Sequence, residues 1–321
     1  MLFEPIGETL TFRLIEHVNQ CRLIIVGSER VDDLPTVVSP TREIQMNFRA
    51  ELAGRCVSLF SSFAVIIVLL TYIYMRYKER LPGIFQYSFL FGKRKPTFDS
   101  RFEVLRLPKS WFRYFYLVGV ISTSIMMFVE SRVTHPHLTV LLSLGLFLTH
   151  LVRRFYETVF VSRFGRNQMS VTHFVLGLFF YCTVPIALHG SRTEAVSRGP
   201  LGITFSAFQI AALQYSQHVV CRQLADLRKP GSGKPNESVN SKYFIPTGSM
   251  FQHITCPHYL FEIALYLSLH WLLTTRWTLF SHIVLFVFAN QICSAWVTHS
   301  WYQEQFPEWA KERYALVPYV F

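Results

Sequence analysis

Long apolar windows recur along this 321-residue chain, and each approaches the length that a helix needs to cross a lipid bilayer. About 20 predominantly apolar residues span the hydrocarbon core. Seven windows of this kind are predicted, at residues 57–75, 114–130, 137–158, 171–189, 201–221, 258–274 and 277–298. The chain is 51% hydrophobic and 16% aromatic, which is too apolar for an ordinary soluble domain of this size. The pattern predicts an all-α integral membrane protein, a bundle of seven transmembrane helices.

The net charge of +11 is distributed unevenly between the connections. Lys and Arg crowd the connections after the first, third and fifth windows, and the opposite connections carry few of them. Cytosolic loops of membrane proteins carry this excess of positive charge. We therefore expect a lumenal amino terminus and a cytosolic carboxyl terminus, and no nucleic-acid partner. Residues 1–55 are predicted to form a lumenal extension of unknown role, ahead of a membrane domain at residues 56–321.

Polar residues at helical spacing lie inside the third and fifth windows. His150, Arg153 or Arg154, and Glu157 fall on one helix face, and Gln214, Gln217, His218 and Cys221 follow a similar spacing. A basic helix end with a satisfied ion pair is the plainer interpretation of the first group, and an anionic-ligand site is the sharper one. For the glutamines, hydrogen bonding between helices is the plainer interpretation.

The sixth window carries a carboxylate in its middle. Glu262 lies between His258 and Tyr266, each four residues away. A charged side chain at the bilayer centre costs roughly 2.5–3.5 kcal/mol on insertion scales, so such residues are usually functional. We therefore expect Glu262 to take part in the chemistry of this protein.

Several motifs of known enzyme classes are absent from the sequence. It has no histidine boxes of a di-iron desaturase, no DDxxD, no GxSxG and no GxGxxG that follows a strand. Its six cysteines form no CxxC pair, so a disulfide framework is not expected. No metal is expected either, and a nicotinamide cofactor would not be held by a Rossmann domain.

A set of motifs extends over residues 85–321. The pieces are His150-x-x-Arg153-Arg154-x-x-Glu157, Gln217-x-x-x-Cys221, Leu227-Arg228-Lys229, Tyr243-Phe244-Ile245-Pro246-x-Gly248, Pro257-His258-Tyr259-Leu260-x-Glu262, His299-x-x-Tyr302, and the ending from Arg313 to Phe321. Together they resemble the steroid 5α-reductase family. Upstream, Phe91-Gly92-Lys93-Arg94-Lys95 and the run from Leu107 to Tyr116 are similar to the branch of polyprenol reductases, also called polyprenal reductases.

The resemblance implies a seven-helix enzyme of the endoplasmic reticulum membrane that uses NADPH, with cytosolic loops closing over a buried nucleotide site and a family-like region at about residues 150–321. It implies a cofactor site formed by Arg154, Gln217, Arg228, Lys229, His258, Tyr302 and Arg313. The catalytic residues that it implies are Glu262, His150 and Tyr156.

The implied reaction is reduction of the α-isoprene double bond of a long-chain polyprenoid, in the dolichol synthesis that supports protein N-glycosylation. Hydride adds to an alkene only where the resulting carbanion is stabilised, so the aldehyde is the expected substrate and a coupled polyprenol/dolichal dehydrogenase the expected partner. Leu151 stands where the steroid enzymes of the family carry a tyrosine, which leaves Tyr114, Tyr156 and His150 as candidate proton donors. The alternatives are a reductase of 4-ene-3-oxosteroids, a membrane methyltransferase that uses S-adenosylmethionine, and a lipid transporter or scaffold.

Overall fold

A computed structural model describes residues 40–77, 80, 106–164, 168–228, 244–248 and 250–319. The chain divides into two compact units, Met1–Asn47 and Phe48–Phe321, and the second contains every feature discussed below. Most of the predicted N-terminal extension lies outside the described residues, as does Lys229, which was predicted to contact the cofactor.

Helices dominate the described residues. The long helices are α1 (Pro40–Tyr77), α3 (Phe112–Ser131), α4 (Leu138–Tyr156), α5 (Val171–Gly190), α6 (Pro200–Asp226), α7 (Pro257–Leu273) and α8 (Leu279–Gln305). Helix α4 continues into a π-helical turn, η4 (Glu157–Val161), and a short helix, α9 (Pro307–Lys311), follows α8. Two three-residue strands, β1 (Arg106–Pro108) and β2 (Gln168–Ser170), pair antiparallel just before α3 and α5. The predicted all-α class is thus confirmed, with this one small sheet added at the entry to two helices.

Among the residues that the structure describes, five helices are long and apolar enough to cross a membrane. They are Glu51–Tyr77, Lys109–Ser131, Leu138–Val161, Val171–Gly190 and Leu279–Gln305. They coincide with five of the seven predicted windows. Helix α6 is as long as α8 but more polar, because it carries Gln209, Gln214 and Gln217, and α7 ends after 17 residues. These two helices therefore fall short of the length and composition that the other five satisfy.

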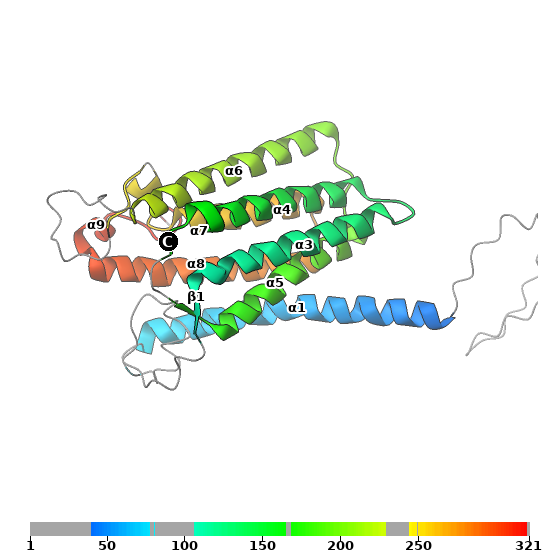
Figure 1. Ribbon diagram of the computed structural model, residues 1–321, viewed down its shortest axis with the longest axis horizontal. Helices are drawn as coiled ribbons and strands as arrows, with labels where there is room; N and C mark the ends of the chain where they lie inside the picture. The colour runs from blue at the N-terminus through cyan, green and yellow to red at the C-terminus, as the bar shows by residue number, and fades with distance from the viewer. Residues whose placement is uncertain are drawn as a thin grey trace, which may run out of the picture. The chain divides into compact units, whose positions relative to one another are not determined.

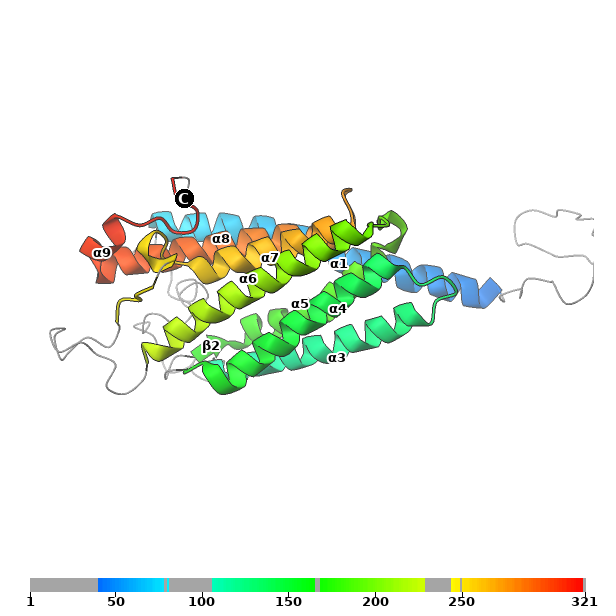
Figure 2. The ribbon, with the colours of Figure 1, turned by 90° about the horizontal axis from the view of Figure 1, so that it is seen from above.

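The contacts between helices fix their relative directions (Figures 1 and 2). Helices α1 and α8 run in the same direction, because Ser61 Oγ lies 2.6 Å from His282 Nδ1 and Cys293 lies farther along beside the Ile67 carbonyl. Helix α6 lies against both α4 and α7. It runs parallel to α4 and antiparallel to α7, so the ends of α4 and α6 and the start of α7 meet at one end of the bundle.

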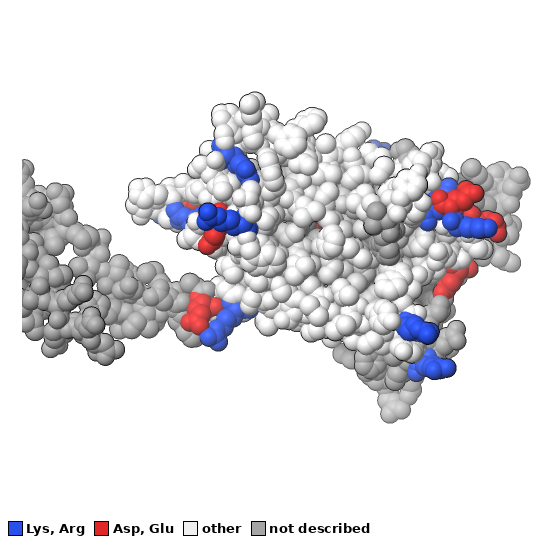
Figure 3. Space-filling model, turned by 180° about the vertical axis from the view of Figure 1, so that it is seen from behind, with Lys and Arg blue, Asp and Glu red and all other residues white. Residues whose placement is uncertain are grey.

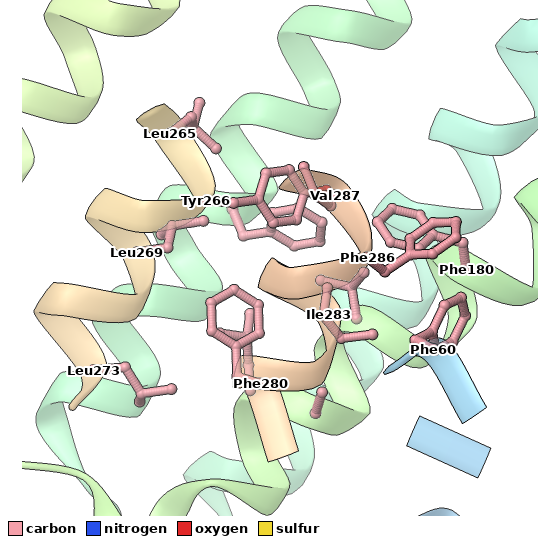
Figure 4. Close-up of a cluster of buried hydrophobic side chains, with 14 of the residues drawn as sticks. Phe60, Phe180, Leu265, Tyr266, Leu269, Leu273, Phe280, Ile283, Phe286 and Val287 are labelled. Carbon is pink, nitrogen blue, oxygen red and sulfur yellow. The ribbon is translucent and has the colours of Figure 1, made fainter. Parts of the chain in front are cut away.

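An aromatic core joins α1, α5, α7 and α8 (Figure 4). The Phe60 ring lies 5.1–5.7 Å from the rings of Phe179, Phe180 and Phe286. The close approach of α5 to α3 depends on Gly177, because a Cβ there would lie 2.8 Å from the Phe115 ring. Rings at these distances pack favourably and bury large apolar areas. The core therefore helps to fix α7, one of the four helices that carry the polar residues described next.

The outer surface suits a lipid environment. On the face seen in Figure 3, charged side chains gather toward the two ends of the helices and leave an uncharged band between them. Along α6, Leu201, Phe205, Phe208 and Tyr215 are all exposed. An apolar surface of this extent is unusual in a soluble monomer and marks a face covered by lipid or by another apolar partner.

Candidate functional site

A cluster of polar side chains lies inside the bundle at the end where α4 finishes and α7 begins. We call it the Glu157–Glu262 cluster. Its members are Tyr116 of α3, His150, Arg153 and Arg154 of α4, Glu157 of η4, Gln217, His218 and Cys221 of α6, and Glu262 of α7. It therefore links four helices through polar contacts.

Glu157 is the anionic centre of one half of the cluster. Its carboxylate is fully buried and accepts hydrogen bonds from Arg153 and Arg154, while His218 Nδ1 lies 2.8 Å away. A buried carboxylate is tolerated only when such partners compensate its charge. The two arginines thus remain fixed in the bundle, where each keeps donor groups for further partners.

Arg154 extends the cluster from α4 to α3 and α6. Its Nη2 donates to the Tyr116 hydroxyl at 3.0 Å, and its Nη1 lies 3.3 Å from Cys221 Sγ. The guanidinium also lies over the Tyr116 ring, 5.2 Å from its centroid. Contacts of this kind hold an arginine in one orientation, which suits recognition of a phosphate or a carboxamide.

Glu262 is the anionic centre of the other half. Gln217 Nε2 donates to its Oε2 at 2.6 Å and to the His258 carbonyl at 3.3 Å. His150 Nε2 is 3.5 Å from Glu262 Oε1. Gln217 also accepts a hydrogen bond from Arg153, so a continuous path of polar contacts joins Glu262 to Glu157.

The tautomer of His150 follows from its neighbours. Its Nδ1 lies 3.2 Å from Arg153 Nη2, and a guanidinium can only donate, so Nδ1 must accept. The proton of the neutral ring is therefore on Nε2, the atom that faces Glu262. Nε2 is buried without a hydrogen-bond partner in the described residues. This is a polar atom that a bound ligand would satisfy.

A second group of predicted residues lies closer to the chain end. Tyr302 packs on Trp309 with ring centroids 5.0 Å apart, and Arg313 lies over the same tryptophan ring at 4.6 Å while its Nε donates to the Phe251 carbonyl at 2.7 Å. Arg228 is exposed just after α6, donates to the Arg163 carbonyl and interacts electrostatically with Tyr302. These three residues therefore surround the same end of the bundle as the cluster.

The C-terminal segment covers the start of α7. The backbone N–H of Thr255 donates to the Tyr314 carbonyl at 2.9 Å, and that of Cys256 donates to the Ala315 carbonyl at 3.2 Å. His258 follows directly, with its ring 4.0 Å from the Tyr259 ring. The last described residues thus position the helix that carries Glu262.

The structure does not bring every predicted site residue together. Tyr156 is 51% exposed and packs on Phe160, which is more exposed still. It follows Arg154 by two residues, about 200° around the helix, so it points away from the cluster. Tyr114 is also exposed and packs on Trp111. Both tyrosines therefore lie on the outer surface.

In the described residues, no group of three or more His, Cys, Asp or Glu side chains is placed to hold a metal ion. The donor set of the cluster suits an organic ligand with phosphate and carboxamide groups. Two arginines, an amide and a carboxylate lie within one network, and one imidazole nitrogen there, 3.5 Å from Glu262 Oε1, makes no hydrogen bond in the described residues. A nicotinamide nucleotide has the matching groups.

Comparison with known proteins gives the family. Residues 167–321 match the family model described as 3-oxo-5-alpha-steroid 4-dehydrogenase. A polyprenal reductase of Caenorhabditis elegans is 31% identical over 257 residues, which are 69% of this chain and 82% of that protein. This chain belongs to the steroid 5α-reductase family. The polyprenal reductases of Homo sapiens and Saccharomyces cerevisiae are each 26% identical, over 75% and 76% of this chain and 88% of each relative.

The family model covers only part of the cluster. Gln217 and Glu262 lie inside the matched residues 167–321, whereas His150 and Glu157 precede them. Sequence spacing had indicated each helix face, with Arg153 in a candidate anionic-ligand site and His218 beside the glutamines. It did not indicate Tyr116 as part of the site, because the place of Tyr116 beside Arg154 depends on how α3 packs against α4.

Proposed function

We propose that this protein is an NADPH-dependent polyprenal reductase, which saturates the α-isoprene double bond of a long-chain polyprenal in the dolichol synthesis that supports N-glycosylation. The observation that carries the proposal is the Glu157–Glu262 cluster, a buried polar network inside an otherwise apolar bundle. The names of the relatives support the substrate class. The apolar outer surface supports access of an isoprenoid from the lipid phase.

The proposal includes a multi-pass protein of the endoplasmic reticulum membrane with seven spanning helices. Helix α6 lies parallel to α4, with Val196 just before α6 at the Thr139 end of α4 and Gln217 at the Arg153 end. It therefore covers the same depth as α4, which is long and apolar enough to cross. Helix α7 runs back beside α6. The basic connections after α1, α4 and α6 support a lumenal amino terminus and a cytosolic carboxyl terminus.

We assign the cofactor to the end of the bundle where the cluster and the C-terminal segment meet. Arg154, Gln217 and His258 would hold it from inside the bundle, and Arg228, Lys229, Tyr302 and Arg313 from nearer the aqueous side. Arg forks suit the pyrophosphate and the 2′-phosphate. Bound NADPH would supply a hydride.

Glu262 and His150 would orient the reacting end of the cofactor. Glu262 accepts from Gln217, which fixes the amide so that the remaining lone pairs of the carboxylate are available to a carboxamide or a ribose hydroxyl. His150 presents its Nε2 proton to the same region. These groups would bind the cofactor and orient its reacting end.

The substrate would be the aldehyde and not the alcohol. Hydride addition to an α,β-unsaturated aldehyde gives an enolate, whereas a plain allylic alcohol gives an unstabilised carbanion. A single oxyanion-hole donor contributes roughly 3–4 kcal/mol in mutational tests, too little to stabilise such a carbanion. A separate dehydrogenase acting on polyprenol and dolichal would then complete the conversion of polyprenol to dolichol.

The test is product analysis with purified protein in detergent or nanodiscs. Polyprenal, polyprenol and a 4-ene-3-oxosteroid are offered in parallel with NADPH, with S-adenosylmethionine as the control cofactor. We expect dolichal from polyprenal and no product from polyprenol. Conversion of the steroid alone would contradict the substrate, and conversion of polyprenol with no aldehyde trapped would contradict the aldehyde mechanism. Failure to consume NADPH with all three would contradict the reductase proposal itself.

A further inference from the structure

The buried hydroxyl of Tyr266 has no hydrogen-bond partner in the described part of the chain. Tyr266 lies on α7, and only 1% of the residue is exposed. An unsatisfied buried hydroxyl destabilises the folded protein. Buried tyrosine hydroxyls usually find a partner. The Tyr266 hydroxyl, which has no such partner in the described residues, therefore needs an explanation.

The position of Tyr266 relates it to the proposed site. It follows Glu262 by four residues, one helical turn or about 6 Å along the axis, on the same face of α7. The hydroxyl interacts electrostatically with Glu262 and Tyr116, the two residues that bound the cluster on α7 and α3. Tyr266 lies one helical turn beyond Glu262, outside the polar cluster and inside the apolar core.

The surroundings of the ring hold it in place. Phe147 packs edge-on at 5.9 Å. Phe180 lies 6.2 Å away, and Phe280 stacks at 6.3 Å (Figure 4). Leu269 and Val287 are members of the same buried cluster. A tyrosine fixed among apolar groups presents its hydroxyl as a preorganised donor, which needs no reorganisation when charge develops on a ligand oxygen.

The proposed reaction requires a hydrogen-bond donor that lies among apolar groups. An enolate oxygen needs a hydrogen-bond donor, and the isoprenoid chain attached to it needs apolar surroundings. Tyr114 and Tyr156 are exposed on the outer surface. Tyr266 meets both requirements. We infer that Tyr266 is a catalytic residue whose hydroxyl donates a hydrogen bond to the carbonyl oxygen of the substrate aldehyde, an inference that rests on the proposed function.

The proposed reaction transfers a hydride and a proton to the substrate. The β-carbon gains a hydride and forms a new C–H bond, and the π pair of the double bond moves so that the carbonyl oxygen becomes an enolate oxygen. Tyr266 stabilises this oxygen by its hydrogen bond. The α-carbon then takes a proton from water and the carbonyl reforms. The alkene is reduced by two electrons and the nicotinamide is oxidised by two.

The test compares Tyr266→Phe with Tyr215→Phe, a matched change at an exposed tyrosine of α6. Removing one oxyanion donor lowers kcat by about 10²–10³-fold. We expect this loss for Tyr266→Phe, with a much smaller change in KM for polyprenal and wild-type kinetics for Tyr215→Phe. Melting temperature in detergent is measured alongside. Because the lost hydroxyl has no partner, the variant should be at least as stable as the wild type.

A second readout needs neither cofactor nor turnover. Dolichal labelled with ¹³C at its carbonyl is bound to the protein, and the carbonyl stretch is recorded by infrared difference spectroscopy. A donor lowers the wavenumber of this band, so Tyr266→Phe should raise it and Tyr215→Phe should not. Wild-type activity in Tyr266→Phe, or a lost activity with an unchanged carbonyl band, would overturn the inference. An inactive wild type that still shows the Tyr266-dependent band would overturn the proposed function and leave the carbonyl site standing.

Discussion

Two fully buried glutamates lie toward opposite ends of the bundle, and their partners differ in kind. Glu130, at the end of α3, is bonded by His189 Nδ1 at 2.8 Å and by the backbone N–H of His137 at 2.8 Å, with Arg192 Nε at 3.9 Å. Glu157 is bonded by side chains from α4 and α6 and connects through Arg153 and Gln217 to Glu262. Both carboxylates are compensated, but only the second belongs to a network that crosses several helices.

The difference shows how a buried charge can serve structure or chemistry. The Glu130 partners lie at the ends of helices and in the turns beside them, so they fix the connection from α3 to α4 against the end of α5. Among the described residues, each group includes a buried imidazole nitrogen that makes no hydrogen bond, His137 Nδ1 at the Glu130 end and His150 Nε2 in the cluster. His137 precedes α4, whereas His150 lies within α4 in a network that joins four helices and lies one turn from the Tyr266 hydroxyl. We therefore expect ligand binding at one end and only helix attachment at the other.

The largest effect is expected from Glu262→Gln. The change removes the charge and keeps the shape and one hydrogen-bonding oxygen for Gln217. If Glu262 orients the reacting groups, kcat with polyprenal should fall by at least about 100-fold. Insertion and melting temperature should stay near those of the wild type. Full activity in a correctly inserted variant would mean that Glu262, like Glu130, has only a structural role.

The second prediction concerns Glu130, at the opposite end of the bundle. Glu130→Gln keeps the volume but weakens hydrogen bonds made to a charged acceptor, which contribute about 1.5–3 kcal/mol each. The unfolding midpoint in denaturant should fall, while kcat and KM of the protein that remains folded should match the wild type. A clear loss of kcat without a loss of stability would break the proposed division between the two ends.

Sequence reasoning recovered the helix faces of the cluster and not the contacts between them. Helical spacing placed His150, Arg153 or Arg154, and Glu157 on one side of α4 before any packing was known. The same spacing could not show that Tyr156 faces outward, because the orientation of a helix depends on its neighbours. Tyr266 was visible only as part of a stripe with Glu262, and its lack of a partner depends on the packing of Phe147, Phe180 and Phe280 around it.

The seven windows illustrate the same limit. Composition predicted seven windows. Five of them match helices that, among the described residues, are long and apolar enough to cross, and the other two lie at α6 and α7. Alternating spans already imply that α4 and α6 run in the same direction, but composition could not show that they lie side by side, since that depends on contacts such as Arg153 with Gln217. Gln217, one of the glutamines that make the α6 window less apolar, also connects Glu262 to Arg153, so the same residue lowers the hydropathy of α6 and builds the polar network.

A moderate effect is expected from Arg228→Ala. Arg228 is exposed at the end of α6, where a phosphate could be met without burying an unpaired charge. Its loss should raise KM for NADPH by roughly tenfold, which corresponds to about 1.4 kcal/mol. KM for polyprenal should stay within about twofold of the wild type, since Arg228 would contact only the cofactor. An unchanged KM for NADPH would move the phosphate site inward to Arg154 and make the cluster alone responsible for cofactor binding.

The smallest effect is expected from Arg192→Ala, which sharpens the view of the Glu130 end. The Arg192 guanidinium is 3.9 Å from Glu130 and partly exposed, and it also donates to the His135 carbonyl. Partly exposed ion pairs of this length contribute about 0.2–1 kcal/mol. Because His189 and the His137 backbone remain bonded to Glu130, the unfolding midpoint should fall less than in Glu130→Gln, and activity should be unchanged. The decrease should shrink at high salt, which screens this exposed pair. A loss as large as that of Glu130→Gln would mean that Arg192, and not His189, compensates the buried carboxylate.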